Sequence, residues 1–545
     1  MTRDDEPHEG RTADFDVVVV GAGFAGLYAL HRLRELGLSA VAFEAGDGVG
    51  GTWYWNRYPG ARCDVESIEY SFSFSPEIEQ EWDWTDLMPS QPEVERYLNF
   101  VCDRLDLRRE IRFSTRVTRM TFDEPRAIWS VETDAGDVVT APFVIAATGC
   151  LSAPLEPDIP GVSSFEGVSL YTNRFPKEGF DFTGKRVGVI GTGSSGVQCI
   201  PVIAEQADRL YVFQRSAAYT FPSSARPLEP SELAELKAMY PEIRRQQQAS
   251  PAGAVRLSAF AALFQPSKGE ILDTPYEEQL RVLDEHGWLG AFAWSDALLD
   301  IDANRAATRL YGEMIRRTVH DPETAASLVP QYPFGCKRPI VDVGYFETFN
   351  RHNVTLVDLK KDPIDTITAH GIRTREHDLE LDVIVFATGF DAMTGALTRV
   401  DIRGRDGRSL KDEWADGPRA YLGLAVAGFP NLFTVTGPGS PSVLTNMVTS
   451  IELHVDWIAD CLVYLRDHGA HTIEADADAQ EAWVEHGASL VEGRIPSHPS
   501  CNSWYVGANI PGKTRVYMPY AGGHVSYKEQ CEAVAAEGYD GFLVG

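Results

Sequence analysis

The stretch Gly21-Ala-Gly23-Phe-Ala-Gly26 decides the fold, because it follows the apolar run 15–20 and precedes a helix-compatible segment. A second copy, Gly191-Thr-Gly193-Ser-Ser-Gly196, follows the apolar run 187–190 and precedes another such segment. In a strand–turn–helix unit, the first glycine makes the tight turn, the second admits a pyrophosphate, and the third lets the helix pack on the strand. Because the N-terminus of each helix then faces the phosphates, the two units predict two bound dinucleotides.

The second strand of each unit distinguishes the two ligands. The run 40–44 ends in Glu44, a carboxylate placed to accept hydrogen bonds from a ribose diol. The corresponding position in the second unit is the neutral Gln214, which is followed by Arg215 and Ser216. A carboxylate would repel a 2′-phosphate, whereas the arginine and the hydroxyl would bind it. The first site is therefore predicted to hold FAD and the second NADP, which implies hydride transfer between a nicotinamide and a flavin.

Composition limits the class of protein. The chain has 545 residues, 44% hydrophobic and 23% charged, as in a soluble globular protein of two or three domains. A net charge of −30 argues against a nucleic acid or an anionic membrane as a partner. No uncharged apolar run reaches the roughly 18 residues that span a bilayer, and residues 1–9 are too acidic for a signal or transit peptide. We expect a cytoplasmic protein that is a monomer or a weak homo-oligomer.

The eight cysteines are scattered and include no CxxC pair. This spacing argues against a secreted disulfide scaffold, and the equally dispersed histidines argue against a zinc site, so no metal is expected. Disulfide reductases also carry FAD and a nicotinamide site, but they need a redox-active cysteine pair beside the flavin. That class of enzyme is therefore disfavoured.

The order of the motifs predicts an α/β fold with two Rossmann-like dinucleotide-binding domains and a helical insertion in the NADP domain. The strands 143–149 and 383–389 both end in Ala-Thr-Gly and are expected where the chain crosses between the domains, which makes the FAD domain discontinuous. Between them, about 220–330 has a helical pattern with a loop expected at 246–253. The expected parts are FAD domain 1–147, NADP domain 148–216, helical insertion 217–331, NADP domain 332–388 and FAD domain 389–545.

Four loops hold functional groups. Residues 50–64 are dense in aromatic rings, glycine and arginine, a combination that is costly to bury unless it wraps a ligand. Residues 335–339 place two cations in one loop, and 437–447 form a small-residue loop that leads into a helix expected at about 443–466. Residues 502–513 are expected to be a surface loop with an aromatic pair and a lysine. The alternative for residues 50–64 is an aromatic mini-core under a long loop, although a ligand is favoured there. Taken singly, the other three loops are better explained as a solvated pair of charges, a helix-entry turn and a packing tryptophan.

Together these motifs resemble the Baeyer–Villiger monooxygenases, flavoenzymes that insert oxygen next to a ketone carbonyl. The resemblance covers nearly the whole chain and is carried by the two glycine motifs, residues 51–64, Phe213-Gln-Arg215, Lys337-Arg338, residues 387–391 and Trp504-Tyr505. It implies that NADPH reduces FAD and that O2 adds to the flavin to give a C4a-peroxyflavin. The peroxide anion would then attack a small-molecule ketone, and the adduct would rearrange to an ester or lactone.

The resemblance also implies roles for individual residues. Arg338 would keep the peroxide anionic, since a cation that cannot give up its proton is needed there, and Asp64 would position Arg338. Lys337 would bind the 2′-phosphate, and Trp504 would close over the nicotinamide and exclude water. The implied cofactor-binding residues are Gly21, Gly23, Gly26, Glu44, Gly51, Thr52, Trp53, Asp64, Tyr70, Thr192, Gly193, Ser194, Ser195, Gly196, Arg215, Ser216, Lys337, Arg338, Met447 and Trp504. The implied substrate pocket comprises Gln91, Pro92, Cys150, Ser442, Val443, Leu444 and Met447.

The chain departs from the family at its fingerprint F-x-G-x-x-x-H-x-x-x-W-P, in which Tyr171 replaces the histidine and Phe175 the tryptophan. This departure bears on how tightly NADPH oxidation is coupled to product. Two alternatives stay open: oxygenation of amines or sulfides, which requires the protonated hydroperoxide, and a flavoprotein that is a poorly coupled NADPH oxidase or a binding module. The presence of Asp64 and Lys337-Arg338 favours the peroxide anion, and therefore a ketone as the substrate.

Overall fold

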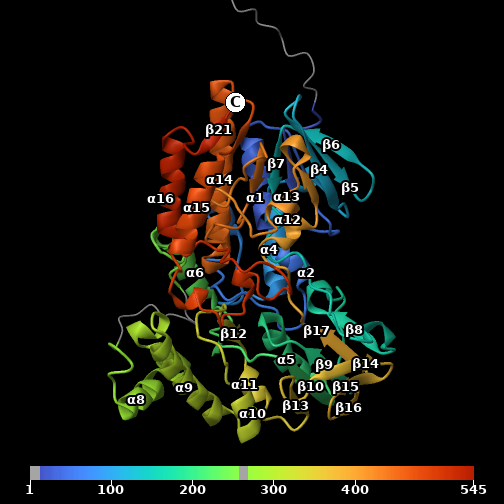
Figure 1. The fold of residues 1–545 in the computed structure, drawn as a ribbon, viewed down its shortest axis with the longest axis vertical. Coiled ribbons are helices and arrows are strands. Elements are labelled where there is room, and N and C mark those ends of the chain that lie inside the picture. The colour runs from blue at the N-terminus through green and yellow to red at the C-terminus, as the bar shows by residue number, and fades with distance from the viewer. Residues whose placement is uncertain (1–12, 257–267) are drawn as a thin grey trace, which may run out of the picture.

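The structure is a computed structural model that describes residues 13–256 and 268–545 (Figure 1). Two five-stranded parallel sheets organise it, with strand orders β19-β7-β1-β2-β3 and β13-β10-β9-β17-β8. The first sheet and the helices around it form the upper half of the view in Figure 1, and the second sheet lies at the lower right. Within the described ranges, no helix is both long enough and apolar enough to cross a membrane. The acidic residues 1–9 lie outside the described part of the chain.

The first sheet combines strands from both ends of the chain. Its strands are β1 (Val17–Val20), β2 (Ala40–Phe43), β3 (Ile111–Arg112), β7 (Phe143–Ala146) and β19 (Leu432–Thr434). All four residues of β1 are buried, since Val17 and Val19 face a core under α1 (Phe24–Glu35) and α14 (Met447–His468). Val18 and Val20 face the other core, under a second sheet layer. A strand buried on both faces explains the continuous valine run.

That second layer is a four-stranded sheet of order β18-β4-β5-β6. Its strands are β4 (Val117–Asp123), β5 (Ile128–Thr133), β6 (Val138–Ala141) and β18 (Asp401–Arg403). The first three form an antiparallel meander, and β18 joins from the C-terminal part. The remaining elements of this half are α2 (Thr52–Trp55), α3 (Pro76–Glu81), α4 (Gln91–Arg104), α12 (Gly395–Thr398), α13 (Leu410–Glu413), α15 (Ala477–Ser489), α16 (Gly523–Ala536), β20 (Ile473–Ala475) and β21 (Phe542–Val544).

The second five-stranded sheet has the same plan. Its strands are β8 (Val168–Tyr171), β9 (Arg186–Ile190), β10 (Arg209–Gln214), β13 (Val354–Asp358) and β17 (Val383–Phe386). Helix α5 (Ser194–Gln206) and α11 (Tyr345–Thr348) share a core on one face. The small antiparallel sheet β14 (Ile364–Thr368), β15 (Gly371–Thr374) and β16 (Asp378–Glu380) covers the other face. Both parallel sheets therefore place a glycine motif after a central strand, and the predicted α/β class with two Rossmann-like domains is confirmed.

The helical region divides between two cores. Its elements are β11 (Thr220–Pro222), α6 (Pro230–Ala238), α7 (Tyr240–Gln248), α8 (Tyr276–His286), α9 (Ile301–Thr318) and α10 (Pro322–Ser327). Side chains of α6 and α7 belong to the core of the first sheet, whereas α8 and α9 pack with the core of the second, at the lower left of Figure 1. Strand β11 pairs with β12 (Ile340–Asp342), which leads the chain back to the second sheet.

The loop expected at 246–253 begins later than predicted, because α7 continues to Gln248. Gln247 is buried, and its side-chain amide donates to the carbonyls of Glu69 at 3.3 Å and Gly253 at 3.4 Å. The polar run Gln246-Gln-Gln therefore turns one glutamine inward, where it joins this helix to the first domain. A pattern of polar residues cannot reveal such a buried amide.

Candidate functional site

The two glycine motifs adopt the same strained turn. Gly21 and Gly191 have φ values of 109° and 111°, a region that L side chains rarely occupy. A Cβ on Gly26 would collide with the carbonyl oxygen of Gly21, and one on Gly196 with that of Gly191. Each helix therefore crosses the preceding turn at a distance that only glycine permits.

Both helices also leave their first-turn N–H groups free for an anion. Helices α1 and α5 start after Gly23 and Gly193, and no side chain in the described part of the chain accepts a hydrogen bond from their first turns. By contrast, Asn446 caps α14 through its side chain. A Cβ built on Gly193 meets nothing within 4 Å, so open space lies in front of the α5 N-terminus, where Ser194 and Ser195 form the first turn. This arrangement fits a pyrophosphate.

The first motif is enclosed by the loop that follows β2. Glu44 is buried, and its two oxygens accept from the N–H groups of Ala22 at 2.9 Å and Gly46 at 2.7 Å. Burial raises the pKa of Glu44 above its ordinary value, although these hydrogen bonds oppose the shift. Each oxygen keeps a second lone pair for a ribose hydroxyl. Gly51 lies against the motif, since a Cβ on it would come within 3.0 Å of the Gly23 Cα.

Three further expected FAD contacts lie in or beside the short helix α2. Thr52 is its first residue, and the indole Nε1 of Trp53 donates to the hydroxyl of Tyr70 at 3.2 Å. Burial raises the pKa of Tyr70 well above its ordinary value, so the hydroxyl stays neutral. Gln91, expected in the substrate pocket, donates to the backbone carbonyl of Trp53 and to Glu95, and Pro92 follows it in the first turn of α4.

Residues 57–64 connect the two dinucleotide units. The Tyr58 hydroxyl donates to Gln198 Oε1 at 2.8 Å, and Gln198 Nε2 donates to the Arg62 carbonyl at 3.0 Å. Gly60 is in such close contact with α5 that a Cβ would collide with the carbonyl oxygen of Gln198. The loop thus leaves the first glycine motif, crosses α5 of the second unit and delivers Asp64 to the space between them.

Arg338 is the point where three loops meet. Its Nε donates to Asp64 Oδ2 at 2.7 Å, and its NH1 donates to the carbonyl of Val443 at 2.6 Å. Burial alone would lower the pKa of Arg338, but the charge and hydrogen bond of Asp64 outweigh it and raise that pKa further. The guanidinium is therefore a fixed cation whose position is set by a carboxylate on one side and a backbone carbonyl on the other.

Tyr505 is the fourth residue at this point, and the sequence did not predict its placement. Its loop was expected on the surface, yet Tyr505 is only 4% exposed. Burial raises its pKa to about 12, and the neighbouring Arg338 guanidinium opposes that shift through its charge and a hydrogen bond. Trp504 packs beside it, with ring centroids 4.4 Å apart. The aromatic pair in the sequence was the only signal that could have pointed to it.

A group of cations lies at the carboxyl ends of β10 and β13. Arg215, Lys360 and Lys361 line a cavity of about 180 Å³ with Gln214, Ser327 and Asp358, the carboxylate that pairs with Lys361. Burial, followed by the charges of Arg215 and Lys360, lowers the pKa of Lys337 to about 8. Among the described residues, no carboxylate forms an ion pair with Arg215, Lys337 or Lys360, so the group suits an anion such as a 2′-phosphate.

Thr192 and Lys360 need separate comment, the first as a neighbour of the cation group and the second as one of its members. Thr192 donates through its hydroxyl to the carbonyl of Ser216 at 2.9 Å, which holds the end of β10 against the second glycine motif. Lys360 was missed by the sequence analysis. It follows β13, and because neighbouring parallel strands end at the same edge of a sheet, its position after a strand was the available signal.

Four of the expected substrate-pocket residues come together beside Arg338. Cys150 and Val443 are buried in one apolar cluster, and Leu444 and Met447 pack against it. The other members of the cluster are Ala392, Met393, Tyr505 and Met518, with Leu151, Trp504 and Tyr517 packed against them. Ser442 adjoins the cluster through its hydroxyl, 3.9 Å from the Met393 sulfur. Gln91 and Pro92 are not members of this cluster.

The cluster also contains backbone strain. Met393 and Ser442 have φ values of 67° and 43°, which non-glycine residues rarely adopt. Such residues persist where the surrounding structure holds them, and they concentrate at functional sites. Met393 and Met518 were not predicted, because neither stands in a motif.

A disulfide joins Cys336 to Cys501, 165 residues apart, with their Cα atoms 5.1 Å from each other. The sequence analysis predicted no disulfide, because a sequence pattern indicates a cysteine pair only when the two cysteines are closely spaced. The remaining six cysteines are free and buried.

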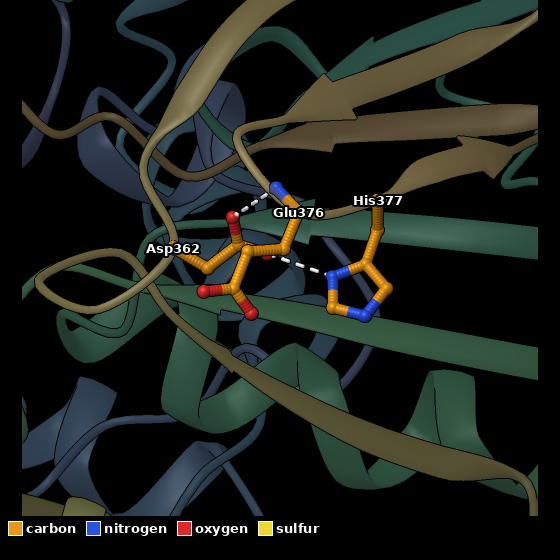
Figure 2. Close-up of side chains that lie close together, drawn as sticks. All are labelled: Asp362, Glu376 and His377. Atoms are coloured by element: carbon orange, nitrogen blue, oxygen red, sulfur yellow. Dashed lines mark hydrogen bonds and ion pairs between the residues drawn. The ribbon is translucent and has the colours of Figure 1, made fainter.

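A group of potential metal ligands lies at the small antiparallel sheet, beginning two residues after Lys360. Figure 2 shows the Asp362 carboxylate joined to the backbone N–H of Glu376 and to the ring of His377. One oxygen of Asp362 accepts from the Glu376 N–H at 2.9 Å, and the other contacts His377 Nδ1 at 2.9 Å and the Thr374 hydroxyl at 2.7 Å. The carboxylate therefore fixes the turn between β15 and β16, and we assign no metal to it.

Tyr171 and Phe175, the two residues where the sequence analysis expected a departure from the family, lie at and just after the end of β8. The Tyr171 ring stacks on Phe386 of β17, with centroids 5.0 Å apart, and the Arg174 guanidinium lies 3.8 Å from the Tyr171 centroid. Arg174 also pairs with Glu156 at 2.6 Å. Phe175 is buried in the core of the second sheet.

Known proteins share this architecture. A family profile described as pyridine nucleotide-disulphide oxidoreductase matches residues 18–252, which include both glycine motifs. The acetone monooxygenase (methyl acetate-forming) of Gordonia sp. (strain TY-5) is 42% identical over 98% of this chain and 99% of its own. A Baeyer–Villiger monooxygenase of Pseudooceanicola batsensis is 41% identical over 97% of this chain and 96% of its own. A structure of oxidized steroid monooxygenase bound to NADP is 50% identical, with a TM-score of 0.90 over 98% of this chain and 99% of that one.

One relative carries a different activity in its name. The phenazine N-monooxygenase PhzNO1 of Lysobacter antibioticus is 39% identical over 97% of this chain and 97% of its own. The disulfide reductase class named by the family profile remains disfavoured, because the chain has no CxxC pair. With near-complete coverage by relatives of this kind and with a site that fits both dinucleotides, the chain belongs to the Baeyer–Villiger monooxygenases, flavoenzymes that use FAD, NADPH and O2 to insert oxygen next to a ketone carbonyl.

Proposed function

We propose that Arg338 and Asp64 are the catalytic pair of this ketone oxygenase. The observation that carries the proposal is the fixed guanidinium, held by Asp64 at 2.7 Å and by the Val443 carbonyl at 2.6 Å. FAD, once bound and reduced by NADPH, supplies the activation of O2. Arg338 would stabilise the negative charge that develops there, and it cannot quench that charge by giving up a proton. Asp64 would hold the guanidinium in place and keep it charged.

The residues proposed to hold FAD surround the first glycine motif. The free N–H groups of the α1 N-terminus would bind its pyrophosphate, and Glu44 would accept hydrogen bonds from its ribose. The further contacts proposed are Gly51, Thr52, Trp53, Tyr70 and Met447. A hydrogen bond between Trp53 and Tyr70 holds both rings in place. The loop that contains them would enclose the flavin.

The residues proposed to hold NADP surround the second motif. Gly193, Ser194 and Ser195 would receive the pyrophosphate at the α5 N-terminus. Arg215, Ser216, Lys337 and the newly found Lys360 would bind the 2′-phosphate. This proposal is supported by the absence, within the described residues, of carboxylate partners for the three cations. Trp504 would close over the nicotinamide and keep water from the reaction.

The substrate is proposed to be an apolar ketone. Cys150, Val443, Leu444 and Met447 lie in the apolar cluster beside Arg338, which would bury a hydrocarbon substituent while the carbonyl faces the cation. Within the family, the motifs of this chain resemble those of phenylacetone monooxygenase, so phenylacetone is the first ketone to test.

The domain boundaries, the location and the assembly state remain proposals. Strands β7 and β19 place residues before 148 and after 388 in the same sheet, which supports a discontinuous FAD domain. The division of the helical region between two cores supports assigning α8 to α10, and not α6 or α7, to the NADP domain. A cytoplasmic location and a monomer or weak homo-oligomer are compatible with the net charge of −30.

The test is an Arg338→Ala variant. It should bind FAD as the wild type does but form no ester, because no fixed cation remains at the reaction site. FAD content, NADPH consumption and ester yield are measured on the same preparation. An Arg338→Lys variant keeps the charge but loses the fork that contacts both Asp64 and Val443, so a small residual ester yield is expected. Ester formation by Arg338→Ala at the wild-type rate would contradict the proposed role.

A second candidate function is oxygenation at nitrogen, favoured by the relative named as an N-monooxygenase. An electrophilic oxygen donor must be protonated to be attacked by an amine, whereas the fixed Arg338 cation favours the anion. Assays with matched amine and ketone substrates, with products identified by mass spectrometry, separate the two functions. If only the amine gave a product, oxygenation at nitrogen would replace ketone oxygenation as the proposed function.

A further inference from the structure

The disulfide lies between two segments that carry proposed functional residues. Cys336 immediately precedes Lys337 and Arg338, and Cys501 stands three residues before Trp504. Both cysteines are buried, at 1% and 0% exposure, in a small cluster with Ile495. The bond therefore connects the loop that presents the cations directly to the loop that carries the aromatic pair.

The other attachments of the aromatic loop lead elsewhere. Lys513 Nζ contacts Asp391 Oδ1 at 2.6 Å, and Asn509 Nδ2 donates to the Phe390 carbonyl at 2.8 Å. Both partners follow β17 and belong to neither the 335–339 loop nor its neighbours in sequence. Contact between the two loops includes side-chain packing and the Arg338 charge beside Tyr505, to which the disulfide adds a covalent bond.

We propose that Cys336 and Cys501 form a redox modification site whose oxidant is hydrogen peroxide, and that the disulfide form holds the Trp504 loop against the Lys337-Arg338 loop. The proposal rests on the proposed function for the roles of Trp504 and Arg338. In the dithiol form the loop keeps only its non-covalent contacts. The 335–339 loop and the aromatic loop then separate more readily, and the coenzyme site closes less completely.

The chemistry balances with peroxide alone. One cysteine thiolate attacks an oxygen of hydrogen peroxide, the O–O bond breaks, and the products are a sulfenic acid and hydroxide. The second thiolate attacks the sulfenic sulfur, the S–O bond breaks and the disulfide forms. The two thiol protons end on the two hydroxides, giving two water molecules. The sulfur pair has lost two electrons, and both have reduced the peroxide.

The oxygenation reaction of the enzyme can itself supply the hydrogen peroxide that oxidises the cysteines. A flavin monooxygenase whose site is incompletely closed releases hydrogen peroxide in place of product. Peroxide that escapes past an open aromatic loop would oxidise the pair, the bond would then hold the loop closed, and the escape would fall. A small thiol would reverse the modification by disulfide exchange. The pair would thus adjust how tightly NADPH oxidation is coupled to product.

The first experiment follows the bond itself. Purified wild-type holoenzyme is reduced with dithiothreitol, freed of the reductant, and supplied with NADPH and air without ketone, with catalase present or absent. The Cys336–Cys501 peptide is then quantified by mass spectrometry after rapid alkylation. The bond should return without catalase and return far more slowly with it. Equal return in both arms, or no return in either, would overturn hydrogen peroxide as the oxidant.

The second experiment measures the consequence. NADP+ affinity and the fraction of NADPH electrons that appear as hydrogen peroxide are compared for the disulfide and dithiol forms of the wild type. The variants Cys336→Ser and Cys501→Ser are included. The dithiol form and both variants should bind NADP+ about tenfold more weakly, because the loop must be ordered on binding, and should release several times more peroxide. Cys102→Ala, a buried free cysteine in α4, is the matched control and should resemble the disulfide form.

The wild-type comparison uses one chain in two redox states, so misfolding of a variant cannot imitate the effect. If NADP+ affinity and peroxide release are the same in both states, the bond is only structural and the inference is overturned. Because NADP+ binding is measured without ketone, failure of the wild type to oxidise any ketone would contradict the proposed function and leave this test intact.

Discussion

At the scale of single residues, the most informative feature is the group Arg215, Lys337 and Lys360, for which the described part of the chain supplies no carboxylate ion pair. Burial, and then the charges of Arg215 and Lys360, lowers the pKa of Lys337 to about 8. A protein gains nothing in stability from such a group. Its presence is explained by an anion that binds there, and the 2′-phosphate of NADP is the anion that the neighbouring glycine motif would place at that edge of the sheet.

The cation group should set the preference for NADPH over NADH. Losing one charge-assisted contact costs about 1.5–3 kcal/mol, so Arg215→Ala and Lys360→Ala should each reduce the preference by tenfold or more. Lys361→Ala is the matched control, because Lys361 already contacts Asp358 at 3.9 Å and the Ser327 hydroxyl at 3.0 Å. The measurement is kcat/KM with both coenzymes. Equal efficiency of NADPH and NADH in the wild type would contradict the assignment of this site.

Lys337 should make NADP+ binding depend on pH. Free Lys337 loses its proton around pH 8, and a bound phosphate would favour the protonated form and raise that pKa. The dissociation constant should therefore be lowest below pH 8 and rise above it, by up to about tenfold per pH unit. Titrations with NADP+ and NAD+ between pH 6.5 and about 9.5 test this, and only NADP+ should show the rise.

Lys337→Arg supplies the control for that experiment. An arginine keeps its charge throughout this pH range, so the rise should flatten in the variant. The same rise for NAD+, which lacks the 2′-phosphate, would show that another group is responsible.

At the scale of elements, the sequence predicted what local patterns encode. The apolar runs before the glycine motifs are β1 and β9, and the helix expected at about 443–466 is α14. What could not be predicted depends on the fold as a whole. Strand β19 joins β7 across nearly 290 residues, and the α6–α7 pair packs on the first core although it follows the second motif.

The residues of the candidate site likewise divide into those that the sequence indicated and those that only the fold reveals. The role expected of Glu44 came from its residue type and spacing, whereas those expected of Asp64 and Arg338 came from the resemblance to the family. Met393 became visible only when loops from distant parts of the chain were folded together, and the same holds for the Cys336–Cys501 bond. Lys360 lay between these cases, since its place after a strand was a usable signal.

The second glycine motif allows a test with two alanine substitutions, at Gly193 and at Gly196, that should have different effects. Gly193 has φ −80°, which alanine adopts, and open space where a Cβ would point, so Gly193→Ala should fold and keep its FAD. Its methyl group would occupy the approach to the α5 N-terminus, so NADP+ affinity should fall at least about tenfold. Gly196→Ala would instead force α5 away from the turn and should lower the melting temperature.

The control is Gly487→Ala in α15, where a Cβ also meets no atom within 4 Å. It should leave coenzyme affinity unchanged. FAD content, melting temperature and NADP+ affinity are measured for all three variants. Normal NADP+ affinity in Gly193→Ala would show that no pyrophosphate approaches this residue.

At the scale of the whole molecule, two of the segments that connect the dinucleotide units bear on the position of Arg338. Residues 57–64 contact α5 through Gln198, and they also deliver Asp64 to Arg338. The link that precedes β8 is the second connection, and there Glu156, Arg174 and Tyr171 form one chain of contacts that ends on Phe386. Movement of one unit relative to the other would alter both connections, and with them the position of the cation that the chemistry requires.

Tyr171 and Phe175, where the sequence analysis expected an altered fingerprint, belong to that second connection, and they give the last prediction. A histidine at position 171 could make two directional hydrogen bonds and a tryptophan at 175 would add an N–H donor, whereas Tyr171 and Phe175 offer a single hydroxyl between them. The Arg174–Glu156 pair is largely exposed, with side chains 43% and 64% accessible, so it restrains the link only weakly. We expect the units to close incompletely after flavin reduction, so that hydrogen peroxide escapes.

The double reversion Tyr171→His with Phe175→Trp should therefore raise the ratio of ester formed to NADPH consumed under saturating ketone, with little change in FAD content. Arg174→Ala is the complementary variant, since it removes the cation over the Tyr171 ring and should lower that ratio. Phe175 is buried, so the melting temperature is recorded to detect overpacking by the larger ring. An unchanged or lower ratio in a double revertant of normal stability would mean that the stacking of Tyr171 on Phe386 already does what the histidine does in the family, and that peroxide escape is controlled elsewhere, at the aromatic loop and its disulfide.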